Sequence, residues 1–299
     1  MRLKASSIIC AVLALIFATG AGAALAAESK CAGYLNTKAY ENAIPVCTDE
    51  IRSGRFTGND LAVLYDELGL AYANTGQYSL AIPDFTNSIS IDPSKASVYG
   101  DRGTSYMYTG QFNLAAADFS KLIELEPSNT DAYDLRGLSY YYGGQYDLAI
   151  ADFAKLKELT PSEPDGYKGL GLVYYRKGEY DLAIADLTKA IGLKPEDPDS
   201  YKARGLCYEK KHDFGLAIND FTKAIDLDPS DSAAYAGRGN VYIDKGQYDL
   251  AISDFTTAIA KNPEDAEAYY GRGLAHEKKG ETSLANQDYQ RARGLLRGR

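Results

Sequence analysis

The chain has 299 residues, with 32 Lys and Arg against 41 Asp and Glu, 2 His, 4 Cys and no Trp. A formal charge of −9 argues against a nucleic-acid binder, because such proteins neutralise phosphates with basic side chains. Two histidines leave little room for a histidine-based metal cluster or a Ser/His/Asp triad, while 45% hydrophobic and 24% charged residues are ordinary for a folded protein.

The first 26 residues have the pattern of a secretory signal peptide. Arg2 and Lys4 precede an apolar run over residues 8–18, and small residues lead to an A-x-A cleavage pattern at 24–26. The apolar run is short for a membrane span, although an uncleaved anchor is the alternative. We therefore expect residues 1–26 to be removed and the protein to be exported, to the periplasm, with no membrane association afterwards.

Residues 28–61 match a later part of the chain. Tyr40-x2-Ala43-Ile44-Pro45 has the same pattern as residues 78–83, at an offset of 38 residues. This offset implies about four inserted residues in the region 53–59 when it is compared with the period of the units that follow. The segment is expected to be a degenerate copy of the helix pair described next.

A 34-residue period covers the rest of the chain, with prolines at each step from Pro93 to Pro263. In every copy the fourth residue is Tyr, the eighth Gly, the twentieth Ala and the twenty-third Asp. The period defines seven repeats, at 62–95, 96–129, 130–163, 164–197, 198–231, 232–265 and 266–299.

One repeat shows what each copy folds into. Tyr133, Gly137 and Tyr140 have helical spacing and mark the buried side of a first helix. Gly144 suits the left-handed turn that ends it, and Asp147 is expected to cap a second helix. A single hairpin of this kind cannot bury its own apolar face, so the repeats must stack on one another.

The pattern Y-x2-R-G-x2-Y-x5-Y-x2-A-x2-D-F resembles the tetratricopeptide repeat (TPR) family, over residues 62–299. The resemblance implies an all-α, right-handed superhelical solenoid of helix-turn-helix repeats. It also implies that the residues 28–61 are a TPR-like helix pair. Where the family often has Leu after the first aromatic position, this chain keeps it only at Leu68 and Leu170 and has Arg in the other repeats.

Each of these arginines stands sixteen residues before the framework Asp of its repeat. We interpret the pairs as structural ion pairs between the two helices of a repeat, because copies of a catalytic group would not recur along the whole chain. The pairs are Arg102–Asp118, Arg136–Asp152, Arg204–Asp220, Arg238–Asp254 and Arg272–Asp288.

The cysteines suggest a covalent tie at the N-terminal end. In the alignment of residues 28–61 with the first repeat, Cys31 replaces Gly69 and Cys47 replaces Phe85, positions that face each other across a helix pair. In an exported chain this favours a Cys31–Cys47 disulfide, with two buried thiols as the alternative. Cys207 has no partner and is expected to be an inert buried thiol.

The TPR resemblance implies that the first helices line a concave groove for a ligand. Two features make this chain's groove distinctive, namely tyrosines that the repeat framework does not require and a group of basic side chains. The groove residues expected on this basis are Met107, Tyr108, Leu138, Tyr141, Tyr142, Lys168, Leu172, Tyr175, Arg176, Lys202 and Lys210.

The tyrosines carry most weight in this expectation. Of the 25 Tyr, all but Tyr108, Tyr141, Tyr142, Tyr175 and Tyr270 fall on framework-like positions or in the N-terminal segment. Tyrosine gives a binding surface a large contact area at low entropic cost. The alternative is that several of these rings pack between neighbouring helices and are simply interior.

The sequence thus predicts an exported scaffold that binds a peptide segment of a partner protein in a Tyr-lined groove, with basic residues selecting acidic flanks. Leu138, Leu172 and Leu206 occupy the ninth position of their repeats, where the carboxylate clamp of chaperone-binding TPR proteins needs Asn, so that mode of binding is not expected. Glycan or cell-wall fragment binding and self-assembly are the alternatives. We expect no enzymatic activity, cofactor, metal or nucleic acid, and the oligomeric state and the partner's identity stay open.

Overall fold

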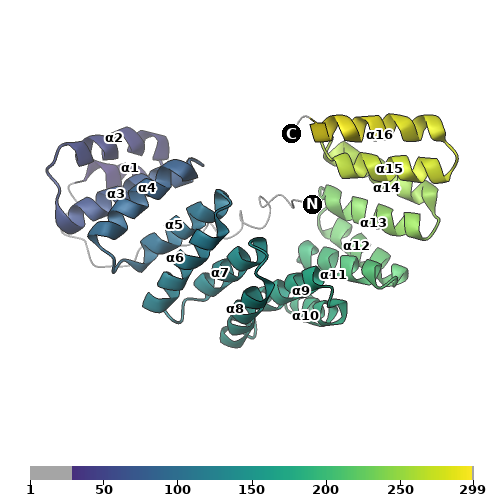
Figure 1. The fold of residues 1–299 in the computed structure, drawn as a ribbon, viewed down its shortest axis with the longest axis horizontal. Helices are drawn as coiled ribbons and strands as arrows, with labels where there is room; N and C mark the ends of the chain where they lie inside the picture. The colour runs from purple at the N-terminus through teal and green to yellow at the C-terminus, as the bar shows by residue number, and fades with distance from the viewer. Residues whose placement is uncertain (1–28, 298–299) are drawn as a thin grey trace. The chain divides into compact units, whose positions relative to one another are not determined.

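The computed structural model describes residues 29–297, so the expected signal peptide at 1–26 lies outside the described residues. Within this range the chain forms sixteen α-helices and no strand (Figure 1). The chain divides into two compact units, an N-terminal unit that ends at Asp152 and a C-terminal unit that begins at Phe153. The division falls inside helix α8 (Tyr146–Leu159).

Every repeat contributes a first and a second helix. The first helices are α3 (Gly58–Asn74), α5 (Ala96–Tyr108), α7 (Thr130–Tyr142), α9 (Asp165–Lys177), α11 (Pro198–Lys210), α13 (Ser232–Asp244) and α15 (Ala266–Lys278). The second helices are α4 (Tyr78–Ile91), α6 (Phe112–Leu125), α8 (Tyr146–Leu159), α10 (Tyr180–Leu193), α12 (Phe214–Leu227), α14 (Tyr248–Lys261) and α16 (Thr282–Arg297). None of the helices within 29–297 is long and apolar enough to cross a membrane.

The N-terminal segment also forms a helix pair, α1 (Lys30–Asn36) and α2 (Tyr40–Arg52). Both helices pack against α3. The residues inserted before the first repeat lengthen a helix, because α3 begins at Gly58, four residues before the repeat boundary at Ala62.

The turn between the two helices of a repeat depends on a left-handed residue. Gly144 has a φ of +75°, and Gly178 ends α9 with a φ of +80°. In the repeat at 198–231 this place is taken by His212, which adopts a φ of +62°. A non-glycine residue in this region is uncommon, so the surrounding repeat imposes the turn on His212.

The start of the second helices differs from the expectation. Asp147 lies inside α8, which begins at Tyr146, so the prediction that Asp147 caps this helix is wrong. The equivalent helices begin after Gln77, Gln111 and Glu179, whose side chains make no capping hydrogen bond. A polar residue in the first turn resembles an N-cap in sequence, and the aromatic residue before it already belongs to the helix.

The helices of a repeat pack a glycine against a large buried side chain, such as a phenylalanine ring. A Cβ added to Gly69 would lie 2.6 Å from the ring of Phe85, and one added to Gly171 would lie 2.5 Å from Leu187. In the C-terminal unit the same rings also meet a glycine of the following repeat, since a Cβ on Gly237 would lie 2.5 Å from Phe221. These fully buried side chains therefore form the centre of the core.

Candidate functional site

The framework arginines hold the two helices of a repeat together. In the repeat at 232–265, Arg238 Nε and Nη2 donate to Asp254 Oδ2 and Oδ1 at 2.8 and 2.9 Å. The other four arginines make the same two-pronged contact with their aspartates. The five Asp side chains are only 6–9% exposed, so each carboxylate depends on its guanidinium for compensation.

Each arginine also reaches the preceding repeat, which the sequence analysis did not foresee. Arg238 Nη1 donates to Thr222 Oγ1 at 2.9 Å, and the guanidinium lies 5.9 Å from the ring centre of Tyr235. The hydroxyl groups that accept in this way are Thr86, Ser120, Thr188, Thr222 and Thr256. The sequence contained the signal, because this position is Ala154 in the one repeat whose successor has Leu170 instead of Arg.

The two repeats without this arginine differ in what lies beside their framework aspartate. In the repeat at 164–197, Lys157 of the preceding second helix donates to Asp186 at 2.9 Å and lies 4.6 Å from the ring centre of Tyr167. In the first repeat Leu68 leaves Asp84 without a comparable cation among the described residues. Burial raises the pKa of Asp84 to about 6.

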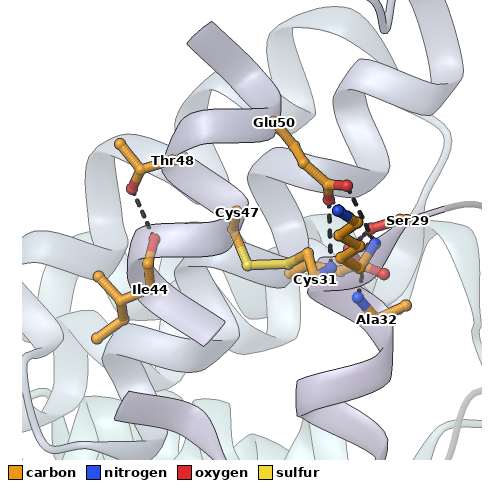
Figure 2. Close-up of a disulfide and its surroundings, with 9 residues drawn as sticks. Ser29, Cys31, Ala32, Ile44, Cys47, Thr48 and Glu50 are labelled. Carbon is orange, nitrogen blue, oxygen red and sulfur yellow. Dashed lines mark hydrogen bonds between the residues drawn. A yellow bond between two sulfur atoms is a disulfide. The ribbon is translucent and has the colours of Figure 1, made fainter. Parts of the chain in front are cut away.

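The N-terminal end is held by a disulfide between Cys31 and Cys47, whose Cα atoms are 4.8 Å apart (Figure 2). Both cysteines are fully buried and belong to a core cluster with Leu64 and Leu68 of α3. Glu50 accepts the backbone N–H of Cys31 at 3.2 Å, and it also accepts the Ser29 hydroxyl at 2.9 Å. The first turn of α1 is therefore fixed both covalently and by a carboxylate.

In the N-terminal unit the structure removes part of the expected groove from the surface. Met107, Leu138 and Tyr141 are buried, with 4%, 8% and 7% of their surfaces exposed. The expectation that these three side chains face a ligand is wrong. They fill space between helices, as the ring of Tyr141 does against Tyr142 and Tyr146.

Tyr108 and Tyr142 remain partly exposed, and each packs on an aromatic residue of the preceding repeat. The ring of Tyr108 is stacked on Tyr78 with the centres 4.1 Å apart. Tyr142 is stacked on Phe112 at 5.6 Å. These tyrosines thus join neighbouring repeats and still keep part of their surface accessible.

In the C-terminal unit two of the expected basic residues are already neutralised. Lys168 Nζ lies 3.0 Å from Asp197, and Lys202 Nζ lies 2.6 Å from Asp231. Asp199 joins the two lysines at 3.7 and 2.8 Å. Burial lowers the pKa of Lys202, but the two aspartates beside it outweigh burial and raise the pKa overall. Lys168 and Lys202 therefore belong to a network of ion pairs within the protein. They are not the free cations that the sequence suggested for selecting an acidic ligand.

The other expected residues of the C-terminal unit keep accessible surface. Leu172 and Tyr175 are partly buried beside the core cluster around Leu187 and Cys207, and the Tyr175 ring lies 5.9 Å from Tyr180. Arg176 and Lys210 are exposed at the ends of α9 and α11. Burial raises the pKa of Tyr175, so its hydroxyl stays a neutral hydrogen-bond donor at physiological pH.

The other reactive side chains, those of cysteine and histidine, do not contribute to the expected ligand-binding groove. Cys207 is fully buried, and burial raises the pKa of its thiol to about 12. His276 is partly buried, and its Nδ1 lies 2.6 Å from Glu281. Among the residues at 29–297 no group of three or more His, Cys, Asp and Glu side chains has an arrangement suited to a metal ion.

Each second helix carries an exposed leucine that escaped the sequence analysis. These leucines share the third position of their helices and are 45–51% exposed. They are Leu80, Leu114, Leu148, Leu182, Leu216, Leu250 and Leu284.

Comparisons with known proteins agree with this architecture. A family profile described as TPR repeat matches residues 137–178, 172–212 and 239–280. Profiles described as tetratricopeptide repeat match residues 62–95, 96–129, 198–231 and 221–253. A search of curated protein sequences found no match.

Solved structures show the same fold. A tetratricopeptide repeat protein from Parabacteroides merdae is 20% identical, with a TM-score of 0.68 over 82% of this chain and 96% of its own. The C-terminal part of a TPR repeat-containing protein from Cytophaga hutchinsonii is 22% identical, with a TM-score of 0.60 over 81% and 97%. A chain of the APC/C hetero-tetramer Cut9–Hcn1 is 20% identical, with a TM-score of 0.65 over 91% of this chain and 54% of its own.

The expected all-α fold of repeated helix pairs is therefore confirmed. This architecture is that of a protein-interaction scaffold. The chain belongs to the tetratricopeptide repeat family.

Proposed function

We propose that this protein is an exported, non-enzymatic scaffold that binds a segment of a partner protein through the first helices of its repeats. Membership of the TPR family supports the general role, and the similar Cut9–Hcn1 chain comes from a multi-subunit assembly. A fold alone does not specify a ligand, so the proposal depends on particular side chains.

The observation that carries the proposal is one partly exposed tyrosine in each unit, Tyr142 in the N-terminal unit and Tyr175 in the C-terminal unit. Neither ring is required by the repeat pattern, and both keep accessible surface near the C-terminal ends of their first helices. Exposed Arg176 and Lys210 lie in the same half of the chain as Tyr175. Aromatic and arginine side chains of this kind dominate the binding energy of protein interfaces.

The disulfide supports the exported location. Disulfides persist in oxidising compartments such as the bacterial periplasm and are rare in the cytosol. The Cys31–Cys47 bond stands a few residues after the A-x-A pattern at 24–26. We expect the protein isolated from its native compartment to begin near residue 27 and to have a mass two hydrogens below that of its reduced form.

Affinity capture from a periplasmic extract tests the binding role. The baits are the exported wild-type chain, Tyr142→Ala, Tyr175→Ala and two matched controls, Leu148→Ala and Leu182→Ala, which shorten exposed side chains on second helices. Circular dichroism establishes that all five baits are folded. We expect one protein to be captured by the wild type and both controls, with affinity reduced at least about tenfold in a tyrosine variant, since that corresponds to about 1.4 kcal/mol.

Other outcomes would reject parts of the proposal. Equal capture by the tyrosine variants and loss in the leucine variants would place the binding surface on the second helices. Capture that survives protease treatment of the extract and is abolished by soluble glycan fragments would identify a glycan-binding protein instead.

A further inference from the structure

The last repeat differs in charge from the other six. It has seven Lys and Arg against four Asp and Glu, whereas acidic residues outnumber basic ones in each of the other repeats. Asp288 is the only acid of α16, and Arg272 already pairs with it at 2.7 Å. Arg293 and Arg297 of α16 are exposed, and neither forms an ion pair within residues 29–297. The surface of α16 therefore has an excess of positive charge.

These two arginines lie on the side of α16 that a further repeat would cover. In the C-terminal unit the twenty-fourth residue of a repeat packs on the next repeat, as the ring of Phe255 does on Gly271, where a Cβ would lie 2.4 Å away. The equivalent of Phe255 is Tyr289, and Arg293 and Arg297 follow Tyr289 at intervals of four residues on the same side of the helix. α16 packs on α15, and no other helix in the described part of the C-terminal unit lies on its outer side (Figure 1).

Two apolar side chains are unusually exposed on the same side. Leu296 and Tyr270 are 62% and 57% exposed, more than any other large hydrophobic side chain among the described residues. Leu296 follows Tyr289 by seven residues, or two helical turns, and the ring of Tyr270 on α15 lies 5.3 Å from that of Tyr289. Tyr270, Tyr289 and Leu296 thus form an apolar strip beside the two arginines.

The repeat framework does not account for the exposed apolar pair. Tyr270 stands at the fifth position, which is Asp, Gly, Lys or Ala in the other repeats. Leu296 stands at the thirty-first position, which is polar in all the others. A terminal repeat needs a polar outer surface for solubility, and Arg293 serves that need in place of the isoleucine of five other repeats. Exposed Tyr and Leu side chains beside it do not, and an apolar centre with a polar rim is the usual composition of an interface.

The charges on this side of the repeat favour an acidic partner. The acids of α15 are Glu267 and Glu277, and Glu277 already accepts the hydroxyl of Tyr289. Arginine binds carboxylates with two parallel hydrogen bonds, so Arg293 and Arg297 suit Asp and Glu side chains. A symmetric dimer through the same surface is disfavoured, because it would bring the arginines of the two copies together.

We propose that Tyr270, Tyr289, Arg293, Leu296 and Arg297 form a docking surface, the terminal face, for an acidic segment of a partner protein. An apolar residue of the segment packs on Tyr270 and Leu296, and its Asp or Glu residues pair with the two arginines. The terminal face does not include the tyrosines at 142 and 175, so its test is independent of the proposed binding role.

Selection of peptides from a random library displayed on phage tests this proposal. The library is first depleted on the folded variant Tyr270→Ala/Arg293→Gln/Arg297→Gln and then selected on the exported wild-type chain, with circular dichroism to verify both folds. We expect the enriched peptides to combine several Asp or Glu with an aromatic or aliphatic residue. Enrichment of no sequence, or of basic or uncharged sequences, would overturn the proposal.

Affinity measurements with a synthetic copy of an enriched peptide separate the two parts of the surface. We expect Tyr270→Ala to weaken binding at least about tenfold, as is typical of an aromatic residue at the centre of an interface. Arg293→Gln/Arg297→Gln should weaken it about fivefold, as expected for two exposed ion pairs, and by less at high salt. This second variant keeps the proposal testable even if Tyr270→Ala fails to fold.

Matched controls exclude unspecific attraction. Lys189→Gln/Lys223→Gln removes two exposed cations from α10 and α12, and Leu250→Ala shortens an exposed leucine of α14. Both should bind the peptide like the wild type. Equal weakening in the lysine control, or unchanged affinity in Tyr270→Ala, would contradict the terminal face. Binding of the wild type to phosphatidylglycerol vesicles and to no peptide would identify a lipid surface instead.

Discussion

The repeats with a framework arginine and the two repeats without it share one fold but are held together differently. In the repeat at 232–265, Arg238 joins Asp254 to Thr222 of the preceding repeat. The repeat at 164–197 obtains its cation from Lys157 of its neighbour, and the first repeat has none for Asp84. The first repeat instead packs against the helix pair that carries the disulfide.

The comparison of repeats with and without the arginine distinguishes the contacts that define the helix pair from those that add stability to it. The contact between a glycine and a ring recurs whether or not the arginine is present, as in Gly69 against Phe85 and Gly239 against Phe255. The ion pair is therefore an addition that a lysine from the adjacent repeat, or a covalent cap at the chain's end, can replace. In a stacked repeat protein each interface contributes locally, so these replacements can be tested one at a time.

The largest effect should come from removing the framework arginine of one repeat, so that it resembles the repeats that have Leu at this position. Arg238→Leu leaves Asp254 buried without its partner, which should destabilise that repeat by about 3 kcal/mol. Hydrogen exchange of the α13 and α14 amides measures this loss. The double variant Arg238→Leu/Asp254→Asn should recover part of it, and equal losses in the single and double variants would show that the carboxylate does not need its cation.

Removal of the disulfide should reduce the free energy of unfolding nearly as much, at the helix pair that packs against the first repeat. Cys31→Ser/Cys47→Ser opens a loop closed over a sequence separation of 16 residues, which corresponds to about 3 kcal/mol. We expect faster hydrogen exchange in α1 and α2 and little change in α13 to α16. Uniform acceleration along the whole chain would contradict the local role of the disulfide.

The substitute cation should have a smaller effect. Lys157→Met removes the partner of Asp186 but keeps most of the aliphatic side chain, and the lysine is 38% exposed, so we expect a loss of about 1 kcal/mol. Lys189→Met, at an exposed lysine of α10, is the control and should have no effect. Restored stability in Lys157→Met/Leu170→Arg would show that the two cations are interchangeable.

The smallest effect, and the one of opposite sign, is expected at Asp84. Its pKa of about 6 lies above the ordinary 3.8, so ionisation destabilises the folded state as the pH rises from about 4 to 6. Asp84→Asn should therefore stabilise the first repeat above pH 6, by about 1 kcal/mol or less after solvent screening, and should change nothing below pH 4. Chemical unfolding at pH 4 and pH 7 measures the difference, and destabilisation at pH 7 would mean that Asp84 has a partner after all.

Much of the fold could be predicted from the sequence because each position of the repeat recurs in every copy and can be compared between copies. The recurrence of Gly137 and its equivalents indicates close helix packing, and Arg238 sixteen residues before Asp254 indicates a contact between two helices. The first turn of the second helices could not be placed, because Asp147 suits both an N-cap and a first-turn position.

The candidate site was less predictable, since surface exposure depends on which neighbours reach a side chain. Lys168 and Lys202 looked like free cations until aspartates twenty-nine residues further on were found beside them. Tyr141 and Tyr142 are adjacent in the sequence, yet only Tyr141 points into the core. Ala154 replaces the usual Thr or Ser in the one repeat that is followed by Leu170 instead of Arg. Comparing such linked positions in successive repeats could therefore have predicted the contact between the arginine and the hydroxyl group.

Site-specific photocrosslinking tests most directly that the first helices bind the partner. A photoreactive amino acid is placed at Tyr142 or Tyr175 on first helices, and at Leu148 or Leu182 on the second helices α8 and α10. After exposure to periplasmic extract, we expect the same protein to be crosslinked from positions 142 and 175 and not from positions 148 and 182. Crosslinking of that protein from 148 and 182 alone would contradict the assignment of the binding surface to the first helices.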